Sequence, residues 1–231
     1  MFENKKISAI IPARGTNDML DNLNLRTLAG QPMINYTINA AKKSKYIDEI
    51  FVSTEDDRIK ELASAHHVVP FMRPMELTST GVSSEEVAFN VISHINKSYD
   101  MTLILWPNAP FRGEDIIDGA IEFFIKNDYR KVQGVKIISD YFLKKENEKL
   151  VPMKLSRGKD RPDVFDVFAV AGGIFIFDTI LLNNNDELVE TGSYIIHEHK
   201  ARLIYSLYDL LIAERLIKLH HTLVDSLAKS T

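Results

Sequence analysis

The sequence predicts a single α/β domain, a three-layer α/β/α sandwich with a mostly parallel sheet. Three observations carry this prediction. Apolar runs of strand length alternate with segments whose apolar residues recur at helical spacing. The run 101–106 is apolar almost throughout, as expected of a strand buried on both faces at the centre of a parallel sheet. The chain has 231 residues, enough for one large core, and the strand–helix–strand order implies right-handed crossovers.

The individual elements follow from these two periodicities. Pro12 should end the first strand, because proline donates no hydrogen bond to a neighbouring strand. A polar loop of roughly a dozen residues then leads to the first helix. Strands are expected at 7–11, 48–54, 68–71, 101–106 and 131–138, and then as a pair at 164–170 and 172–177. Helices are expected at 33–41, 57–65, 83–96, 114–127 and 206–220.

Polar residues mark where two of these helices begin. Thr54 or Asp56 is placed to cap the second helix, so Asp56 and Asp57 are better explained as a cap and a first-turn acid than as metal ligands. Ser83 or Ser84, followed by two glutamates, should open the third helix.

Part of the chain should leave the main sheet. We expect one domain over 1–231, with an excursion within about 139–200 that serves as a lid or a dimerisation arm. Residues 139–168 and 185–200 are the segments concerned. Within the following strand, Gly172-Gly173 is better explained by a bulge or by close packing than by ligand contact.

Composition excludes several classes of function. A net charge of −4 gives no overall attraction to nucleic acid or to an anionic membrane. The absence of cysteine excludes disulfides, thiol catalysis and thiolate metal sites. The first residues carry no signal-peptide pattern, and no apolar run approaches the roughly 20 residues that span a bilayer. We therefore expect a cytoplasmic protein.

The carboxyl ends of the strands should hold the ligand, because ligands of parallel sheets bind there. The loop within 9–26 follows a buried strand and precedes a helix, an arrangement in which backbone N–H groups and basic side chains receive phosphates. Arg14 is the basic residue there, and an ion pair with Asp18 or Asp21 is the alternative role for it. His197-Glu198-His199 permits two-point zinc ligation, but a solvated surface strand explains it better.

Six motifs appear in an order and spacing that identify a family. They are IIPAR at 10–14, the segment 34–59, FMRPMEL at 71–77, LILWPNAPFR at 103–112, AGGIFIFD at 171–178 and DLLIAERL at 209–216. Together they resemble the acylneuraminate cytidylyltransferases, which couple CTP to an eight- or nine-carbon sugar acid and release pyrophosphate. The resemblance implies a Rossmann-like nucleotidyltransferase fold, with CTP and a sugar acid as partners.

The resemblance assigns roles to residues on the nucleotide side. Arg14 and Asn24 match the arginine and asparagine of the family's phosphate loop and are the expected catalytic pair. Gly15 adjoins them in the expected CTP site. Arg73 matches an arginine that reads cytosine, although an arginine before proline can equally fix a turn.

The chain departs from the family at its phosphate loop and metal site. Where the family has a Ser-Lys-Gly turn, this chain has Asn17-Asp18-Met19, and Leu23 replaces a second lysine. The family's Asp-Ile-Asp metal motif corresponds to Leu203-Ile204-Tyr205, which offers no carboxylate for the Mg²⁺ that an active enzyme would need. Asp209 is the weak remaining candidate for a metal ligand.

The sugar side is altered too. Trp106 stands where the family has a glutamine, and it should plug the pocket floor or pack in the core. Arg112, Arg157 and Lys159 are the other expected substrate contacts. Two hypotheses follow: a cytidylyltransferase that acts on a sugar acid, or an inactive family member that binds a nucleotide, a sugar or a partner protein. Family dimers imply a homodimer.

Overall fold

The computed structural model describes residues 5–16, 20–138, 143–146, 149–152, 167–183 and 189–228. Its first half contains β1 (Ile7–Pro12), η1 (Leu23–Leu25), β2 (Thr27–Leu28), β3 (Gln31–Pro32), α1 (Ile34–Lys43), β4 (Glu49–Thr54), α2 (Asp57–Ala65), β5 (Val69–Met72), η2 (Met75–Thr78), α3 (Ser84–His94) and β6 (Met101–Leu105). Its second half contains α4 (Glu114–Lys126), β7 (Lys131–Ile137), β8 (Leu143–Glu146), β9 (Lys149–Pro152), β10 (Phe168–Asp178), η3 (Thr179–Asn183), β11 (Thr191–Ile195) and α5 (Leu207–Ala228).

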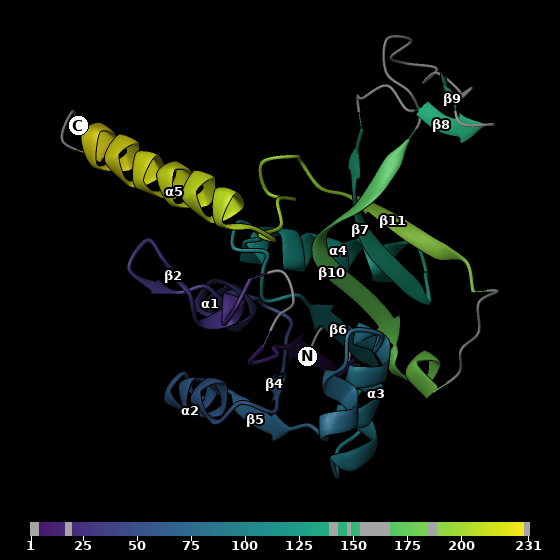
Figure 1. Cartoon of the computed structure of the whole chain (residues 1–231). Helices are drawn as coiled ribbons and strands as arrows, with labels where there is room; N and C mark the ends of the chain where they lie inside the picture. The colour runs from purple at the N-terminus through teal and green to yellow at the C-terminus, as the bar shows by residue number, and fades with distance from the viewer. Residues whose placement is uncertain are drawn as a thin grey trace.

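One seven-stranded sheet organises the molecule, in the order β11-β7-β10-β6-β1-β4-β5 (Figure 1). β1 pairs in parallel with β4 and β6, and β4 with β5, while β10 runs antiparallel to both β6 and β7. After β1 the chain adds β4 and β5 on one side of that strand. It then crosses back and places β6 on the other side of β1. This reversal beside β1 is the switch point at which open α/β sheets bind their ligands.

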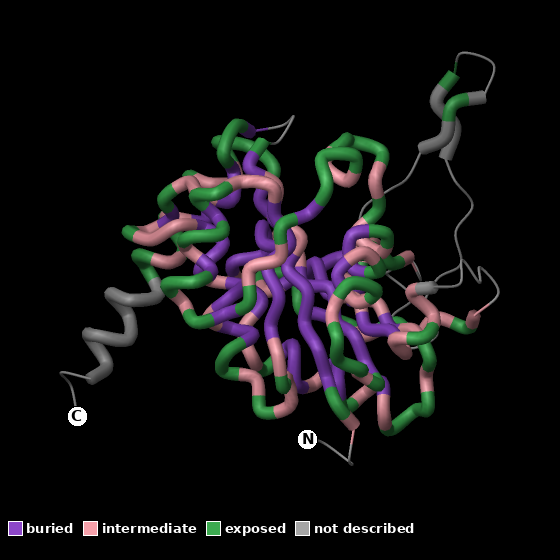
Figure 2. The backbone as a smooth tube through the Cα atoms, turned by 90° about the horizontal axis from the view of Figure 1, so that it is seen from below, coloured by how far each residue is buried: buried purple, intermediate pink, exposed green. Residues whose placement is uncertain are grey.

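Helices cover both faces of the sheet, which confirms the three-layer prediction. Apolar residues of α1, α2 and α4 pack on one face, and those of α3 pack on the other. Within β1 the side chains alternate between these two cores, Ile11 facing the first and Ile10 the second. Figure 2 shows the buried strands passing through the middle of the molecule between more exposed helices. A mostly apolar strand such as β1 is stable only when it is covered on both sides.

The structure also confirms three of the predicted boundaries. Pro12 is the last residue of β1. The Asp56 side chain accepts a hydrogen bond from the Arg58 backbone N–H and caps α2. Ser83 caps α3 in a capping box with Glu86, in which each side chain bonds the backbone N–H of the other.

Three expectations about the second half are wrong. The predicted pair of strands around Gly172-Gly173 is one strand, β10, whose register shifts between Val170 and Phe175. Both glycines have positive φ, 70° and 54°, which confirms the bulge. Residues 191–195 do not leave the sheet, because β11 pairs in parallel with β7. Helix α5 does not end at 220 but continues to Ala228, and Figure 1 shows it running outward from the body.

The remaining part of the expected excursion does lie outside the main sheet. β8 and β9 pair with each other and form a separate two-stranded sheet. Whether this hairpin is a lid or a dimerisation arm stays a prediction. Over the described ranges, no helix is long and apolar enough to cross a membrane.

Candidate functional site

A pocket of about 220 Å³ opens at the carboxyl ends of β1, β5 and β6, beside the switch point. The loops that follow these three strands therefore meet at one pocket, at the carboxyl ends where the sequence predicts a ligand. Four of the expected site residues, namely Arg14, Asn24, Arg73 and Trp106, line this pocket together with other apolar and polar side chains. The lining residues are Pro12, Arg14, Leu23, Asn24, Arg73, Leu77, Ser79, Val82, Ser83, Ser84, Val87, Trp106, Pro107, Asn108 and Tyr205.

Arg14 and Asn24 form the wall beside β1. Asn24 is buried, and its Nδ2 donates to the Arg14 carbonyl oxygen at 2.8 Å, which fixes the backbone of the loop. Arg14 Nη1 donates to the Thr78 carbonyl oxygen at 3.1 Å. A carbonyl takes none of the positive charge of the guanidinium, so Arg14 remains a cation at the pocket wall. Asp18, the residue expected to oppose phosphate here, lies outside the described residues.

Arg73 is only 5% exposed, and its guanidinium is held from three sides. Nη2 donates to Ser53 O at 2.8 Å, Nη1 to Leu77 O at 3.3 Å, and Nε lies 3.5 Å from a Glu55 carboxylate oxygen. Burial lowers the pKa of Arg73 to about 10, with Glu55 opposing the shift and Arg14 adding to it. Arg73 is thus charged at neutral pH. These contacts support the turn-fixing role, and base recognition stays a prediction.

Trp106 lines the pocket and also packs against the core, while its expected substrate contact stays a prediction. Its indole Nε1 donates to Ser84 Oγ at 2.9 Å, and its ring lies 5.3 Å from the Phe175 ring. A Cβ on Gly173 would lie 2.7 Å from the Trp106 Cβ, so the positive-φ bulge is also where β10 approaches the tryptophan.

Arg112 does not line the pocket but lies buried beneath it, 1% exposed. Nη1 donates to the carbonyl oxygens of Gly172 and Gly173 at 3.0 and 2.5 Å. Nη2 donates to Thr37 Oγ1 at 3.1 Å and to Trp106 O at 3.3 Å. Burial lowers the pKa of Arg112 to about 9, so this cation also keeps its charge at neutral pH. It fixes the bulge that supports the pocket floor, and its predicted substrate contact would require access that this geometry denies.

Asp209 has a structural explanation. Its Oδ2 accepts from the Ser206 backbone N–H at 2.9 Å, and its own N–H donates to Ser206 Oγ at 3.1 Å, which is a capping box at the start of α5. Burial raises the pKa of Asp209, but hydrogen bonds from Ser206 and Tyr205 more than offset this and lower it. A carboxylate already used as a cap is a poor candidate for metal binding.

Leu203-Ile204-Tyr205 gives a divalent cation nothing to bind. Ile204 is buried in an apolar cluster, and Tyr205 lines the pocket. Among the residues that the structure describes, no three histidine, aspartate or glutamate side chains lie close enough together to hold a metal ion. The Mg²⁺ implied by the resemblance therefore does not fit this segment.

A second cavity of about 400 Å³ adjoins the pocket and shares Tyr205 with it. Two cationic residues and one acidic residue stand among mostly apolar ones. The lining consists of Lys136, Val170, Ala171, Glu198, Ala201, Arg202, Leu203 and Tyr205. Sequence reasoning missed Lys136 and Arg202, because neither belongs to a motif and the bulge in β10 brings these segments together.

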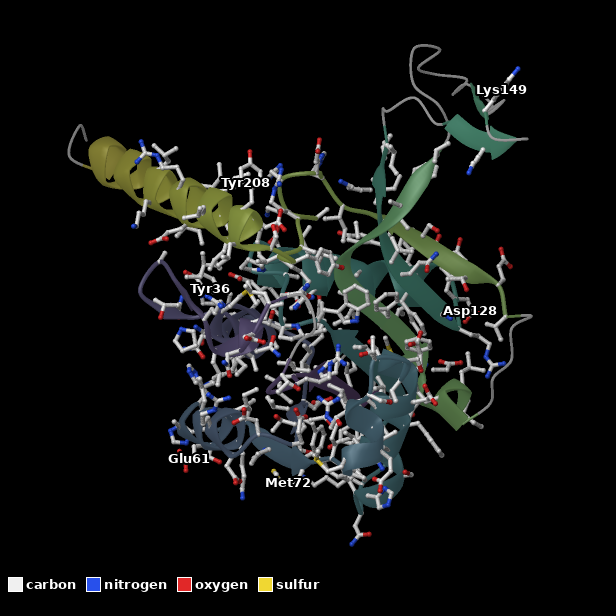
Figure 3. The ribbon with its side chains drawn as sticks, in the orientation of Figure 1. Tyr36, Glu61, Met72, Asp128, Lys149 and Tyr208 are labelled. Carbon is white, nitrogen blue, oxygen red and sulfur yellow. The ribbon has the colours of Figure 1, made fainter. Side chains whose placement is uncertain are left out.

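Other expected residues fall elsewhere. Gly15 does not line the pocket, although its backbone N–H donates to Glu55 Oε1 at 2.7 Å. Arg157 and Lys159 lie outside the described residues. His197-Glu198-His199 lies after β11 at the start of a turn, so the expected surface strand is wrong there, while its histidine rings stack at 6.1 Å. Tyr208 is 72% exposed and points away from the body on α5 (Figure 3).

Comparison with known proteins gives consistent results. The model of a family described as cytidylyltransferase matches residues 8–161. A pseudaminic acid cytidylyltransferase from Campylobacter jejuni is 27% identical over 223 residues, covering 92% of this chain and 96% of its own length. A CMP-N,N'-diacetyllegionaminic acid synthase from Legionella pneumophila is 34% identical over 141 residues, covering 58% and 57%.

The fold has relatives among solved structures. A structure of CMP:2-keto-3-deoxy-manno-octonic acid synthetase complexed with CTP superposes with a TM-score of 0.71, covering 93% of this chain and 99% of the other. The sequence identity is 14%, so this likeness shows the fold alone.

Proposed function

Because this chain belongs to the cytidylyltransferase family, we propose that it transfers CMP from CTP to a sugar acid of the nonulosonic class. The observation that carries the proposal is the pair of adjoining cavities at the switch point. One presents Arg14 and Arg73, the other presents Lys136 and Arg202, and Tyr205 stands between them. Both substrates of such a reaction are anions, and each cavity offers them positive charge.

The first pocket suits the nucleotide. Arg14 would bind the phosphates, since its remaining N–H groups have no hydrogen-bond partner among the described residues. Asn24 would keep the Arg14 backbone in place. The apolar part of the pocket, with Trp106 and Val87, provides a surface for the base. Arg73, which also lines the pocket, supplies further positive charge.

The second cavity suits the acceptor. Lys136 and Arg202 would pair with the carboxylate of the sugar acid, and Glu198 would accept hydrogen bonds from its hydroxyls. An acceptor bound there lies next to Tyr205, and so beside the nucleotide. The acceptor's hydroxyl oxygen would form a bond to the α-phosphorus of CTP and lose its proton to solvent. The bond between the α-phosphorus and the oxygen that bridges to the β-phosphate breaks, and pyrophosphate leaves. Nearby cations stabilise the charge that spreads over the phosphoryl oxygens.

The direct test is an assay of pyrophosphate release with CTP and a panel of acceptors: pseudaminic, legionaminic and N-acylneuraminic acids. Trp106 provides a second readout, because it is the only tryptophan of the chain and lines the nucleotide pocket. We expect CTP to change its fluorescence in a saturable manner and one acceptor to yield pyrophosphate. Neither signal with any acceptor would contradict the proposal.

A second candidate function is nucleotide or sugar binding without transfer. The observation that favours it is the segment Leu203-Ile204-Tyr205, which carries no carboxylate. Transfer relies on charge stabilisation in the transition state, whereas binding does not, so loss of metal ligands removes activity first. Saturable CTP binding with no pyrophosphate release across the acceptor panel would support this function over the first.

Assembly and location belong to the same proposal. We expect a homodimer formed through the segment that contains β8 and β9, and a cytoplasmic location. Sedimentation equilibrium of the purified chain tests the first expectation, because a monomer at micromolar concentration would contradict it.

A further inference from the structure

Glu55 occupies a central position behind the nucleotide pocket, although it does not line it. It follows the last residue of β4, and β4 lies between β1 and β5 in the sheet. The loops after β1 and β5 carry Arg14 and Arg73, so Glu55 lies between the two segments that bring positive charge to the pocket. Its side chain is 12% exposed.

The Glu55 carboxylate contacts both segments. Oε1 accepts a hydrogen bond from the Gly15 backbone N–H at 2.7 Å, next to Arg14. Oε2 lies 3.5 Å from Arg73 Nε, within an ion pair but beyond a hydrogen bond. Neither Oε2 nor Nε has a hydrogen-bond partner in the described part of the chain. The carboxylate thus holds one loop firmly and the other mainly through charge.

A second set of contacts closes a ring. Arg73 Nη1 donates to Leu77 O at 3.3 Å, and Arg14 Nη1 donates to Thr78 O at 3.1 Å. Leu77 and Thr78 are consecutive residues of η2. The two arginines are therefore joined by η2 on one side and by Glu55 with Gly15 on the other.

Gly15 shows how close the first loop comes. A Cβ at Gly15 would lie 2.3 Å from Asp56 Oδ2, a distance that no side chain tolerates. Asp56 cannot easily move, because its carboxylate caps α2 and bonds Arg58. Only glycine lets the loop approach far enough to donate its N–H to Glu55.

Charge explains why an acid is needed at this point. Arg14 and Arg73 line the same small pocket, and two like charges held close together repel each other. In the described residues Glu55 is the acid that pairs with Arg73. A buried charge that loses its partner is strongly unfavourable, so its surroundings rearrange.

We propose that Glu55 is a positioning residue that joins the Arg14–Gly15 loop to Arg73 and so holds both cations in place for the phosphates of the nucleotide. This inference rests on the proposed nucleotide site. It assigns Glu55 no contact with substrate. Its removal should therefore weaken nucleotide binding more than it affects the acceptor.

The test compares Glu55→Gln with Glu49→Gln. Gln keeps an oxygen that can accept from Gly15 but removes the charge that faces Arg73. Glu49 is the matched control because it is the first residue of β4, the strand that Glu55 follows, and because it also pairs with a cation, but at the opposite end of the sheet. The Trp106 fluorescence change measures CTP affinity, and circular dichroism measures the thermal transition.

We expect E55Q to weaken CTP binding at least tenfold and to raise the KM for CTP without changing that for the acceptor. E49Q should stay within twofold of the wild type. E55D keeps the charge on a shorter arm, so its affinity should fall between those of E55Q and the wild type. If E55Q does not fold, E55D is compared with E49Q instead. We then expect E55D to bind CTP at least threefold more weakly than the wild type.

Two failures are distinguishable. If the wild type does not bind CTP, the proposed function is wrong. If the wild type binds CTP and the folded Glu55 variants bind it equally well, the nucleotide site stands and the role of Glu55 is wrong. An equal loss in E55Q and E49Q would also contradict it, because the effect would then be general destabilisation.

Discussion

The two ends of the central sheet carry cavities of different electrostatic character. At the amino ends of the strands, a cavity of about 450 Å³ is lined by Lys6, Asp48, Glu49, Asn96, Lys97, Ser98 and Tyr99. At the carboxyl ends lies the smaller pocket of about 220 Å³. The larger cavity offers more room and more charged residues, but two of those, Lys97 and Glu49, are paired with each other.

The pairing at the amino end is direct. Lys97 bonds Glu49 at 2.7 Å, and the Tyr99 hydroxyl bonds the same carboxylate. At the carboxyl end, Arg14 bonds a carbonyl oxygen, and so does the fully buried Arg112. Carbonyls satisfy the N–H donors without cancelling the charge, so positive potential is left for a ligand. Charge that remains available, rather than cavity size, distinguishes the candidate site.

The largest effect is expected from Arg112→Met, which removes the cation beneath the carboxyl-end pocket. The carbonyl oxygens of Gly172 and Gly173 would lose their buried donor, and each such loss is costly. We expect the free energy of unfolding to fall by about 3 kcal/mol, measured by urea denaturation. Arg112→Lys retains the charge but has fewer N–H donors, so its free energy of unfolding should lie between those of the wild type and the Met variant. A loss below about 1 kcal/mol in the Met variant would contradict the role given to Arg112.

The next effect concerns ligand affinity at the two ends. Arg14→Gln should weaken CTP binding by about tenfold or more, because a charge-assisted hydrogen bond to phosphate is lost. Lys97→Gln removes a cation from the larger cavity and should leave CTP affinity unchanged. Titration by Trp106 fluorescence measures both. Equal losses would mean that the overall charge of the protein, rather than the local site, governs binding.

A smaller effect should follow from placing carboxylates beside the pocket in Leu203→Asp with Tyr205→Asp. The wild type should bind CTP with similar affinity in Mg²⁺ and in EDTA, whereas the double variant should gain about tenfold in Mg²⁺. Tyr205→Phe controls for loss of the hydroxyl. Strong Mg²⁺ dependence in the wild type would show that metal is held by other groups.

The smallest effect is a pH dependence at the amino end. Burial raises the pKa of Glu49, but hydrogen bonds from Lys97 and Tyr99 outweigh it and leave the pKa below its ordinary value of 4.5. A carboxyl with a lowered folded pKa stabilises the fold above its unfolded pKa, and this contribution is lost as pH falls through the folded value. Urea midpoints should therefore drop less between pH 7 and pH 3 in Glu49→Gln than in the wild type. Equal drops in the urea midpoints of the two proteins would contradict the pairing of Glu49 with Lys97 and Tyr99.

Strong periodicity made most of the fold predictable. The runs that became β1, β4 and β6 are mostly apolar, and capping residues such as Asp56 and Ser83 marked the helix starts. β11 was missed because Thr191–Ile195 contains glycine and serine and lies at a sheet edge, where burial demands little. The sequence did not predict that β10 is one continuous strand, because two adjacent glycines resemble a turn. Only the pairing of β10 with both β6 and β7 shows that the glycines form a bulge within it.

The site was predictable where a residue follows a strand. Arg14, Arg73 and Trp106 each do so, and all three line the pocket. The sequence could not distinguish Arg112, which also lies in the loop after β6 but turns inward to the β10 carbonyls. Whether an arginine side chain in such a loop faces the pocket or the core depends on the hydrogen-bond acceptors that the tertiary structure provides. Lys136 and Arg202 were missed for a similar reason, since distant segments bring them together.

Calorimetric titration of the purified protein with CTP, in Mg²⁺ and again in EDTA, tests the central claim most directly, namely that the smaller, carboxyl-end pocket is a cytidine nucleotide site. We expect one CTP per chain with affinity near the micromolar range in both buffers, and loss of the signal in Arg14→Gln but not in Lys97→Gln. No heat of binding up to millimolar CTP in either buffer would contradict the claim.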